Sequence, residues 1–138
     1  MNRIIPGADH RSRHSIAVDF DGVIHQFISP WTGDPEHIPD PPVQGAIEWL
    51  EKMVDDYDVY IFTCRLLASN RSQVERAMRG WFRKHDASQT LVRALRFCYE
   101  KPHVMVYLDD RGMRFEGTFP TVEEIVAASI PWNKKGRT

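Results

Sequence analysis

The sequence predicts a single α/β domain, built as a three-layer α/β/α sandwich around a mostly parallel sheet. Short apolar segments typical of strands alternate with amphipathic segments typical of helices, an order that favours parallel pairing of the strands. Residues 104–108 are apolar without interruption, as in a strand buried on both faces. The length of 138 residues, with 42% hydrophobic residues, suits one domain with a core of its own.

The expected domain covers residues 15–129. Residues 1–14 are polar and contain Pro6 and Gly7, so we expect them to form a flexible N-terminal extension. Residues 130–138 are polar as well, and we expect a loose C-terminal tail.

The first half of the domain begins with a short buried strand expected at 15–18. A helix is expected at about 43–56, where apolar residues recur at helical spacing. Pro41 and Pro42 stand near its start, a place where proline is tolerated. Residues 58–62 are β-branched and aromatic, which predicts a second strand.

The segment 24–42, between the first strand and the first helix, is rich in proline and cannot form a regular element. It also contains apolar residues such as Phe27, Trp31 and Ile38, which argue against simple disorder. We interpret it as a packed flap loop. Trp31 fits two roles equally well, packing within the flap or stacking on a substrate.

A second helix is expected to begin at the capping-box pair Ser72 and Glu75 and to end near residue 85. Residues 87–93 are ambiguous between helix and loop. Residues 94–98 predict a short third strand.

The last part of the domain contains the clearest strand, 104–108, and a candidate fifth strand at 115–119. Thr121 and Glu124 repeat the capping-box pattern, which predicts a final helix to about Ser129.

Charge and cysteine content restrict the environment of the protein. The net charge of −1 gives no overall field that favours nucleic acid or an anionic membrane. Residues 15–60 are mostly acidic and residues 61–101 mostly basic, which indicates either an anion-binding face or a solvated helix surface. Cys64 and Cys98 match no zinc motif and are expected to be reduced thiols. Without an apolar run for a signal peptide or a membrane span, we expect a cytoplasmic protein with no membrane partner.

Polar side chains follow three of the expected strands at the point where each strand ends. They are Asp19 and Asp21, Thr63 and Arg65, and Asp109 and Asp110, with Lys101 just before the last of these strands. In parallel sheets the ligand site lies beyond the carboxyl ends of the strands, so these groups are expected to converge. Clustered carboxylates repel one another unless a divalent cation neutralises them, and oxygen ligands of this kind suit Mg²⁺.

A magnesium site beside a lysine and a hydroxyl group is suited to a phosphate group, because metal and lysine offset its charge. A free carboxylate in such a site can attack phosphorus and form an aspartyl-phosphate. A second carboxylate two residues away can handle the proton.

The pattern Asp19-x-Asp21-Gly22, followed by Thr63, Lys101 and Asp109-Asp110, resembles the haloacid dehalogenase (HAD)-like superfamily of hydrolases. The resemblance covers about residues 15–126, with all four motifs in order. It implies a Rossmann-like sheet and Mg²⁺ as cofactor. The superfamily usually carries a substantial cap, for which this chain has no room, so we expect a small capless type with no large cap domain.

The resemblance also implies roles for single residues. Asp19 would be the nucleophile and a metal ligand, and Asp21 the general acid/base with its backbone carbonyl on the metal. Thr63 would hydrogen-bond a phosphoryl oxygen, and Lys101 would orient Asp19 and stabilise charge in the transition state. The metal would also be held by the paired acids, one directly and the other directly or through water. These two acids are Asp109 and Asp110.

A narrower resemblance concerns Thr63-x-Arg65 and Asp109-Asp110-Arg111, which look like the phosphatase half of phage-type polynucleotide kinases. It implies that Arg65 and Arg111, with Gly22, bind the substrate, and that the substrate is a nucleotide or a nucleic-acid terminal phosphate. Structural ion pairs with the acidic residues are the alternative for both arginines.

Together these observations predict a Mg²⁺-dependent phosphomonoester hydrolase that acts on a phosphorylated small molecule or a nucleic-acid end through an aspartyl-phosphate. A non-catalytic module that binds metal and phosphate, and a phosphotransferase to an acceptor other than water, are the alternatives. None of the six histidines has metal-ligand spacing, and His25 is the one closest to the expected site.

Overall fold

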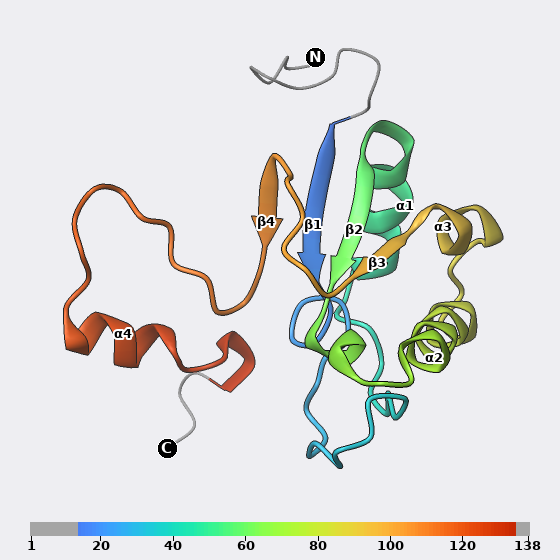
Figure 1. Cartoon of the computed structure of the whole chain (residues 1–138), viewed down its shortest axis with the longest axis horizontal. Coiled ribbons are helices and arrows are strands. Elements are labelled where there is room, and N and C mark those ends of the chain that lie inside the picture. The colour runs from blue at the N-terminus through green and yellow to red at the C-terminus, as the bar shows by residue number, and fades with distance from the viewer. Residues whose placement is uncertain (1–13, 135–138) are drawn as a thin grey trace.

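The structure is a computed structural model that describes residues 14–134. Its centre is a four-stranded parallel sheet with the strand order β3-β2-β1-β4 (Figure 1). The strands are β1 (Ser15–Asp19), β2 (Asp58–Phe62), β3 (Arg96–Cys98) and β4 (Val106–Leu108). The predicted α/β class with a parallel sheet is therefore confirmed.

The register of the sheet brings three strand ends to one edge. Asp19 at the end of β1 pairs with Phe62 at the end of β2, and Val18 pairs with Leu108 at the end of β4. The residues that come next along β2 and β4, Thr63 and Asp109, therefore flank Asp19. This alignment follows from parallel pairing and creates the edge on which the candidate site is built.

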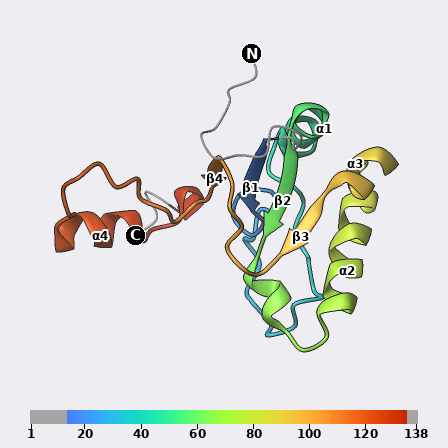
Figure 2. The same cartoon turned by 45° about the horizontal axis from the view of Figure 1, so that its top comes forward.

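The helices are unevenly distributed about the sheet. They are α1 (Ala46–Asp56), α2 (Arg71–Lys84), α3 (Gln89–Ala94) and α4 (Val122–Ala128), with the short 3₁₀ helices η1 (Cys64–Leu67) and η2 (Trp132–Lys134). Helices α1, α2 and α3 stand together beside β2 and β3, whereas α4 lies apart beyond β4 (Figures 1 and 2). The core includes the fully buried side chains Phe20, Leu50, Ile61, Met78 and Phe82.

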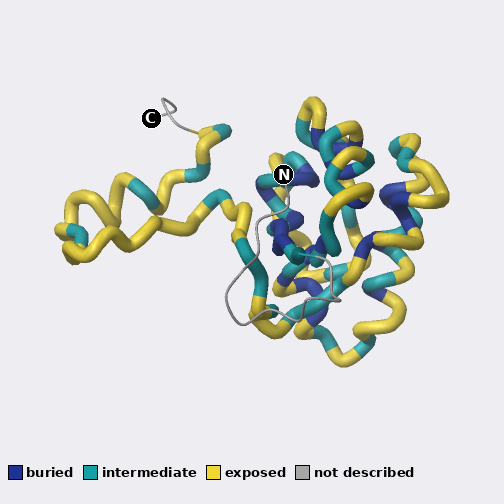
Figure 3. The backbone as a smooth tube through the Cα atoms, turned by 90° about the horizontal axis from the view of Figure 1, so that it is seen from above, coloured by how far each residue is buried: buried dark blue, intermediate teal, exposed yellow. Residues whose placement is uncertain are grey.

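The strand β4 differs from its prediction. It begins at Val106 rather than at residue 104, and its three residues are exposed instead of buried on both faces. The reason is that β4 lies at the edge of the sheet and α4 does not cover it. None of the residues of α4 is buried, and the segment that contains α4 is exposed or half-buried (Figure 3). An apolar run does not distinguish an edge strand from a central one. Among the residues that the structure describes, the third layer of the predicted sandwich is therefore not seen.

The candidate strand at 115–119 is not formed, and the structure has no regular element there. Phe115 and Phe119 are exposed and contact each other, with ring centroids 5.1 Å apart. The helix after them was predicted correctly, because the Thr121 hydroxyl accepts the backbone N–H of Glu124 at 3.2 Å and caps α4.

The helix starts show where local patterns fail. Helix α1 begins at Ala46 instead of residue 43, after Gly45 in the left-handed conformation (φ 83°). Helix α2 begins at Arg71, so the expected cap Ser72 lies inside it, and the Asn70 carbonyl accepts the first helical hydrogen bonds. The ambiguous segment 87–93 contains most of α3, capped by the Ser88 hydroxyl.

Within residues 14–134 no helix has the length and apolar composition that crossing a membrane requires. Cys64 and Cys98 are free thiols, as the sequence predicts.

Candidate active site

Three carboxylates converge at the carboxyl ends of β1 and β4. Asp19 is the last residue of β1, and Asp109 and Asp110 follow β4 directly. One oxygen from each lies within 4.8 Å of the others, close enough to share one cation. The Asp19 carboxylate is also held by the backbone N–H of Phe20 at 2.9 Å. A donor set of oxygens alone fits Mg²⁺.

The electrostatics of this acidic cluster (Asp19, Asp109 and Asp110) agree with a cation site. Burial, the charge of Asp109 and the contact with Asp110 together raise the pKa of Asp19 from 3.8 to about 8. A bound divalent cation would act in the opposite direction, because it favours the ionised form of every carboxylate around it. The residues therefore fit Mg²⁺ both by chemistry and by charge.

Gly22 makes room for the cluster. Its φ of +88° is in the left-handed region, and a Cβ built on it would lie 2.3 Å from an Asp110 carboxylate oxygen. Only glycine leaves this space open, so the Asp-x-Asp-Gly motif here shapes the position of Asp110 as well as the turn after β1.

We expect Gly22→Ala to weaken Mg²⁺ binding by about ten- to a hundredfold, because the new methyl group displaces Asp110. Gly33→Ala is the matched control, since Gly33 has the same φ of +88° but nothing within 4 Å of the added Cβ. Backbone strain alone would lower the free energy of unfolding of both variants by the same amount, about 1 kcal/mol. Calorimetric titration with Mg²⁺ measures the difference, and equal affinities in the two variants would contradict this role of Gly22.

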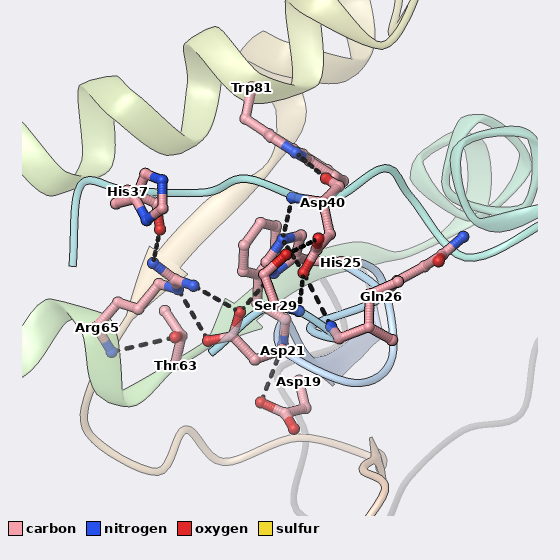
Figure 4. A network of polar contacts seen from close by, with 12 residues as sticks. Asp19, Asp21, His25, Gln26, Ser29, His37, Asp40, Thr63, Arg65 and Trp81 are labelled. Carbon is pink, nitrogen blue, oxygen red and sulfur yellow. Dashed lines mark hydrogen bonds and ion pairs between the residues drawn. The ribbon is translucent and has the colours of Figure 1, made fainter. Parts of the chain in front are cut away.

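Asp21 faces a different set of partners from Asp19 (Figure 4). One carboxylate oxygen accepts from His25 Nδ1 at 2.8 Å and from an Arg65 terminal nitrogen at 2.9 Å, and the other accepts from Arg65 Nε at 2.8 Å. Burial acts to raise the pKa of Asp21, but these hydrogen bonds and the Arg65 charge outweigh it and hold the pKa below its usual value. The Asp21 carboxylate is therefore ionised and fixed in orientation.

His25 connects Asp21 to the far end of the flap. It is fully buried, and its Nε2 accepts the backbone N–H of Asp40 at 3.1 Å. Because Nε2 is the acceptor, the ring proton lies on Nδ1 and is donated to Asp21. In the sequence, His25 stands out only because it is close to the Asp-x-Asp-Gly motif. Its contacts with Asp21 and Asp40 cannot be predicted from the sequence.

Asp40 is a residue that the sequence analysis did not identify. Its carboxylate accepts the backbone N–H groups of Ile28 and Ser29, each at 2.8 Å, and its carbonyl accepts Trp81 Nε1 at 2.9 Å. These bonds tie the segment 24–42 to itself and to α2, so the flap is packed although it contains no helix or strand.

Arg65 is placed differently from its predicted role in substrate binding. Besides Asp21, it donates to the flap carbonyls of Pro35 at 2.8 Å and His37 at 3.0 Å, and it is only 4% exposed. Four of its five N–H donors are thereby used. The geometry favours the alternative of a structural ion pair, which also anchors the flap.

Thr63 and Arg111 lie where the sequence places them, whereas Lys101 does not. Thr63 is buried and lines the pocket; its oxygen accepts the Arg65 backbone N–H, which leaves its own O–H free to donate. Arg111 lines the pocket from an exposed position. Lys101 is exposed, does not line the pocket and has its ammonium 4.8 Å from the centroid of the Tyr107 ring.

The C-terminal segment 131–134 forms a wall of the site that the sequence does not predict. Trp132 Nε1 donates to the Gly22 carbonyl at 2.6 Å, and the Asn133 side chain donates to the Gln26 carbonyl at 3.2 Å. These contacts bring Lys134 to the pocket lining. Side-chain bonds to the loop after β1 therefore hold the start of the expected tail. Residues 135–138, like 1–13, lie outside the described part.

The strand ends, the flap and the segment 131–134 line one cavity of about 570 Å³. The acidic cluster and Thr63 line it together with the flap residues Phe27 and Trp31. This volume is in the range of pockets that hold small molecules.

No family model, curated protein or solved structure matches this chain significantly. The resemblance to the HAD-like superfamily therefore rests on the four motifs alone.

Proposed function

We propose that this protein is a Mg²⁺-dependent phosphomonoester hydrolase of the capless HAD-like type. The observation that carries the proposal is the convergence of Asp19, Asp109 and Asp110, with oxygens within 4.8 Å of one another, beside the free hydroxyl of Thr63 in a single pocket. Mg²⁺ held by the three carboxylates would offset the negative charge of a phosphoryl group.

Asp19 is the nucleophile in this proposal. Its carboxylate oxygen attacks phosphorus, the bond between phosphorus and the ester oxygen breaks, and an aspartyl-phosphate forms on Asp19. Water then attacks the phosphorus and frees inorganic phosphate and the Asp19 carboxylate. Thr63 donates to a phosphoryl oxygen, and the exposed cations that line the pocket, Arg111 and Lys134, add positive charge.

The proton transfers are assigned to Asp21. The ionised form that His25 and Arg65 favour is the one needed to accept a proton from the attacking water. Asp21 then gives that proton to the leaving oxygen of the next substrate. The resemblance implies that Lys101 stabilises charge in the transition state. Lys101 does not line the pocket, so this role requires a movement of the segment between β3 and β4.

The three-layer sandwich is part of the same proposal. Helix α4 exposes Val122, Ile125 and Val126, and β4 exposes Val106 and Leu108. Packing of these two apolar surfaces against each other would supply the missing layer. Slow hydrogen exchange of the α4 amides would support this packing, because a helix of only one to two turns is not stable by itself.

The test of the function is phosphate release by the purified protein with Mg²⁺, on an aryl phosphate, mononucleotides, sugar phosphates and oligonucleotides with terminal phosphates. We expect turnover that EDTA abolishes and Mg²⁺ restores. Added alcohols that become phosphorylated would indicate a phosphotransferase instead. Binding of Mg²⁺ and phosphate without turnover of any substrate would favour the non-catalytic module and contradict the proposal.

A further inference from the structure

The pocket has an aromatic end, formed by two flap residues, in addition to the acidic cluster. Phe27 and Trp31, both from the flap, line the same cavity as Asp19 and Thr63. Their ring centroids are 6.4 Å apart, with the rings at 60°. Trp31 is 52% exposed although it borders the pocket, so the residue is accessible to a ligand.

We infer that this aromatic end binds the planar base of a nucleotide, so that the substrate class is nucleoside monophosphates. The inference rests on the proposed function, because the acidic cluster must hold the phosphate. Bases stack on aromatic rings through their π-faces, and a tryptophan offers the largest such surface. A cavity of about 570 Å³ has room for a mononucleotide.

The aromatic end is held in place before any ligand arrives. The Arg65 guanidinium carbon lies 5.0 Å from the Trp31 ring centroid and 6.0 Å from that of Phe27. Arg65 is itself fixed by Asp21 and by the carbonyls of Pro35 and His37. The same side chain therefore positions both the aromatic rings and Asp21, which ties the base-binding end to the reacting end.

Phe27 adds a second indication of a held geometry. Its φ of 56° is in the left-handed region, which is strained for a bulky residue. A strained backbone conformation persists where the surrounding structure imposes it. Here the strained residue, Phe27, lines the pocket beside Trp31.

The test compares adenosine 5′-monophosphate with ribose 5-phosphate, which share the sugar and the phosphomonoester and differ in the base. With Mg²⁺ present, we expect kcat/KM to favour the nucleotide by roughly ten- to a hundredfold, the range that stacking on one aromatic ring supplies. Trp31→Leu should bring this ratio close to one, and Trp31→Phe should restore most of it. Phe119→Leu is the control, because Phe119 is exposed and does not line the pocket.

Equal kcat/KM values for the two compounds in the unmodified protein would overturn the inference and leave the hydrolase proposal standing. A Trp31→Leu variant that loses both activities in the same proportion would overturn it as well. If neither compound is hydrolysed, the proposed function has failed for this class. The ratio of their calorimetric affinities for the Mg²⁺-loaded protein, in the same variants, then decides the inference by itself.

Discussion

Asp19→Asn is expected to lower phosphate release by about four orders of magnitude or more, because an amide cannot attack phosphorus as a carboxylate does. The fold should be unaffected. The amide oxygen can still accept the Phe20 N–H that Asp19 accepts at 2.9 Å, and a neutral amide replaces a carboxyl group whose charged form is disfavoured by burial and by Asp109. Steady-state kinetics, circular dichroism and thermal unfolding in EDTA measure these three effects.

Asp56→Asn is the matched control for this variant, since Asp56 is an exposed acid at the end of α1 and does not line the pocket. It should retain full activity. The assignment of Asp19 as nucleophile is wrong if Asp19→Asn keeps substantial turnover with an unchanged circular dichroism spectrum.

Arg65→Ala is expected to lower the free energy of unfolding by about 3 kcal/mol or more, because it leaves the partly buried Asp21 carboxylate without its cation. The variant also removes the donors to the Pro35 and His37 carbonyls, so the flap loses an anchor. Arg65→Lys should restore little, since an ammonium cannot reproduce the planar fork of donors. Urea denaturation gives the change in free energy, with the exposed Arg83→Ala on α2 as the control.

The pH dependence of the free energy of unfolding should also change in Arg65→Ala. In the unmodified protein the pKa of Asp21 is lowered on folding, so its contribution is present above its usual value of 3.8 and is lost as the pH falls through the folded pKa. Arg65→Ala should therefore lose less stability on acidification than the unmodified protein. A raised KM with unchanged stability would instead support the original prediction that Arg65 binds substrate.

The sequence predicts the strands that carry the site because their apolar runs are local signals. β1 and β2 are found almost at their predicted bounds, and parallel pairing then brings Asp19, Thr63 and Asp109 together without further information. The prediction of an acidic cluster thus needed only the strand ends and the topology.

What the sequence could not supply depends on contacts between distant residues. The bonds of Asp40 to His25 and to Trp81 join segments 15 and 41 residues apart, and no local pattern indicates them. The bond from Trp132 to Gly22 spans 110 residues. The role of Arg65 could not be predicted for the same reason. Its N–H groups donate to Asp21 and to the flap, and these contacts are visible only in the structure.

The most direct test of Asp19 as the nucleophile is chemical trapping of the aspartyl-phosphate. Borohydride reduces an acyl phosphate to an alcohol, so it converts a phosphorylated aspartate to homoserine. Protein turning over an aryl phosphate with Mg²⁺ would be treated with borohydride, and the modified position read by mass spectrometry. We predict homoserine at position 19, absent with EDTA and absent in Asp19→Asn. Continued phosphate release with Asp19 unmodified, or modification at another acid, would contradict the account.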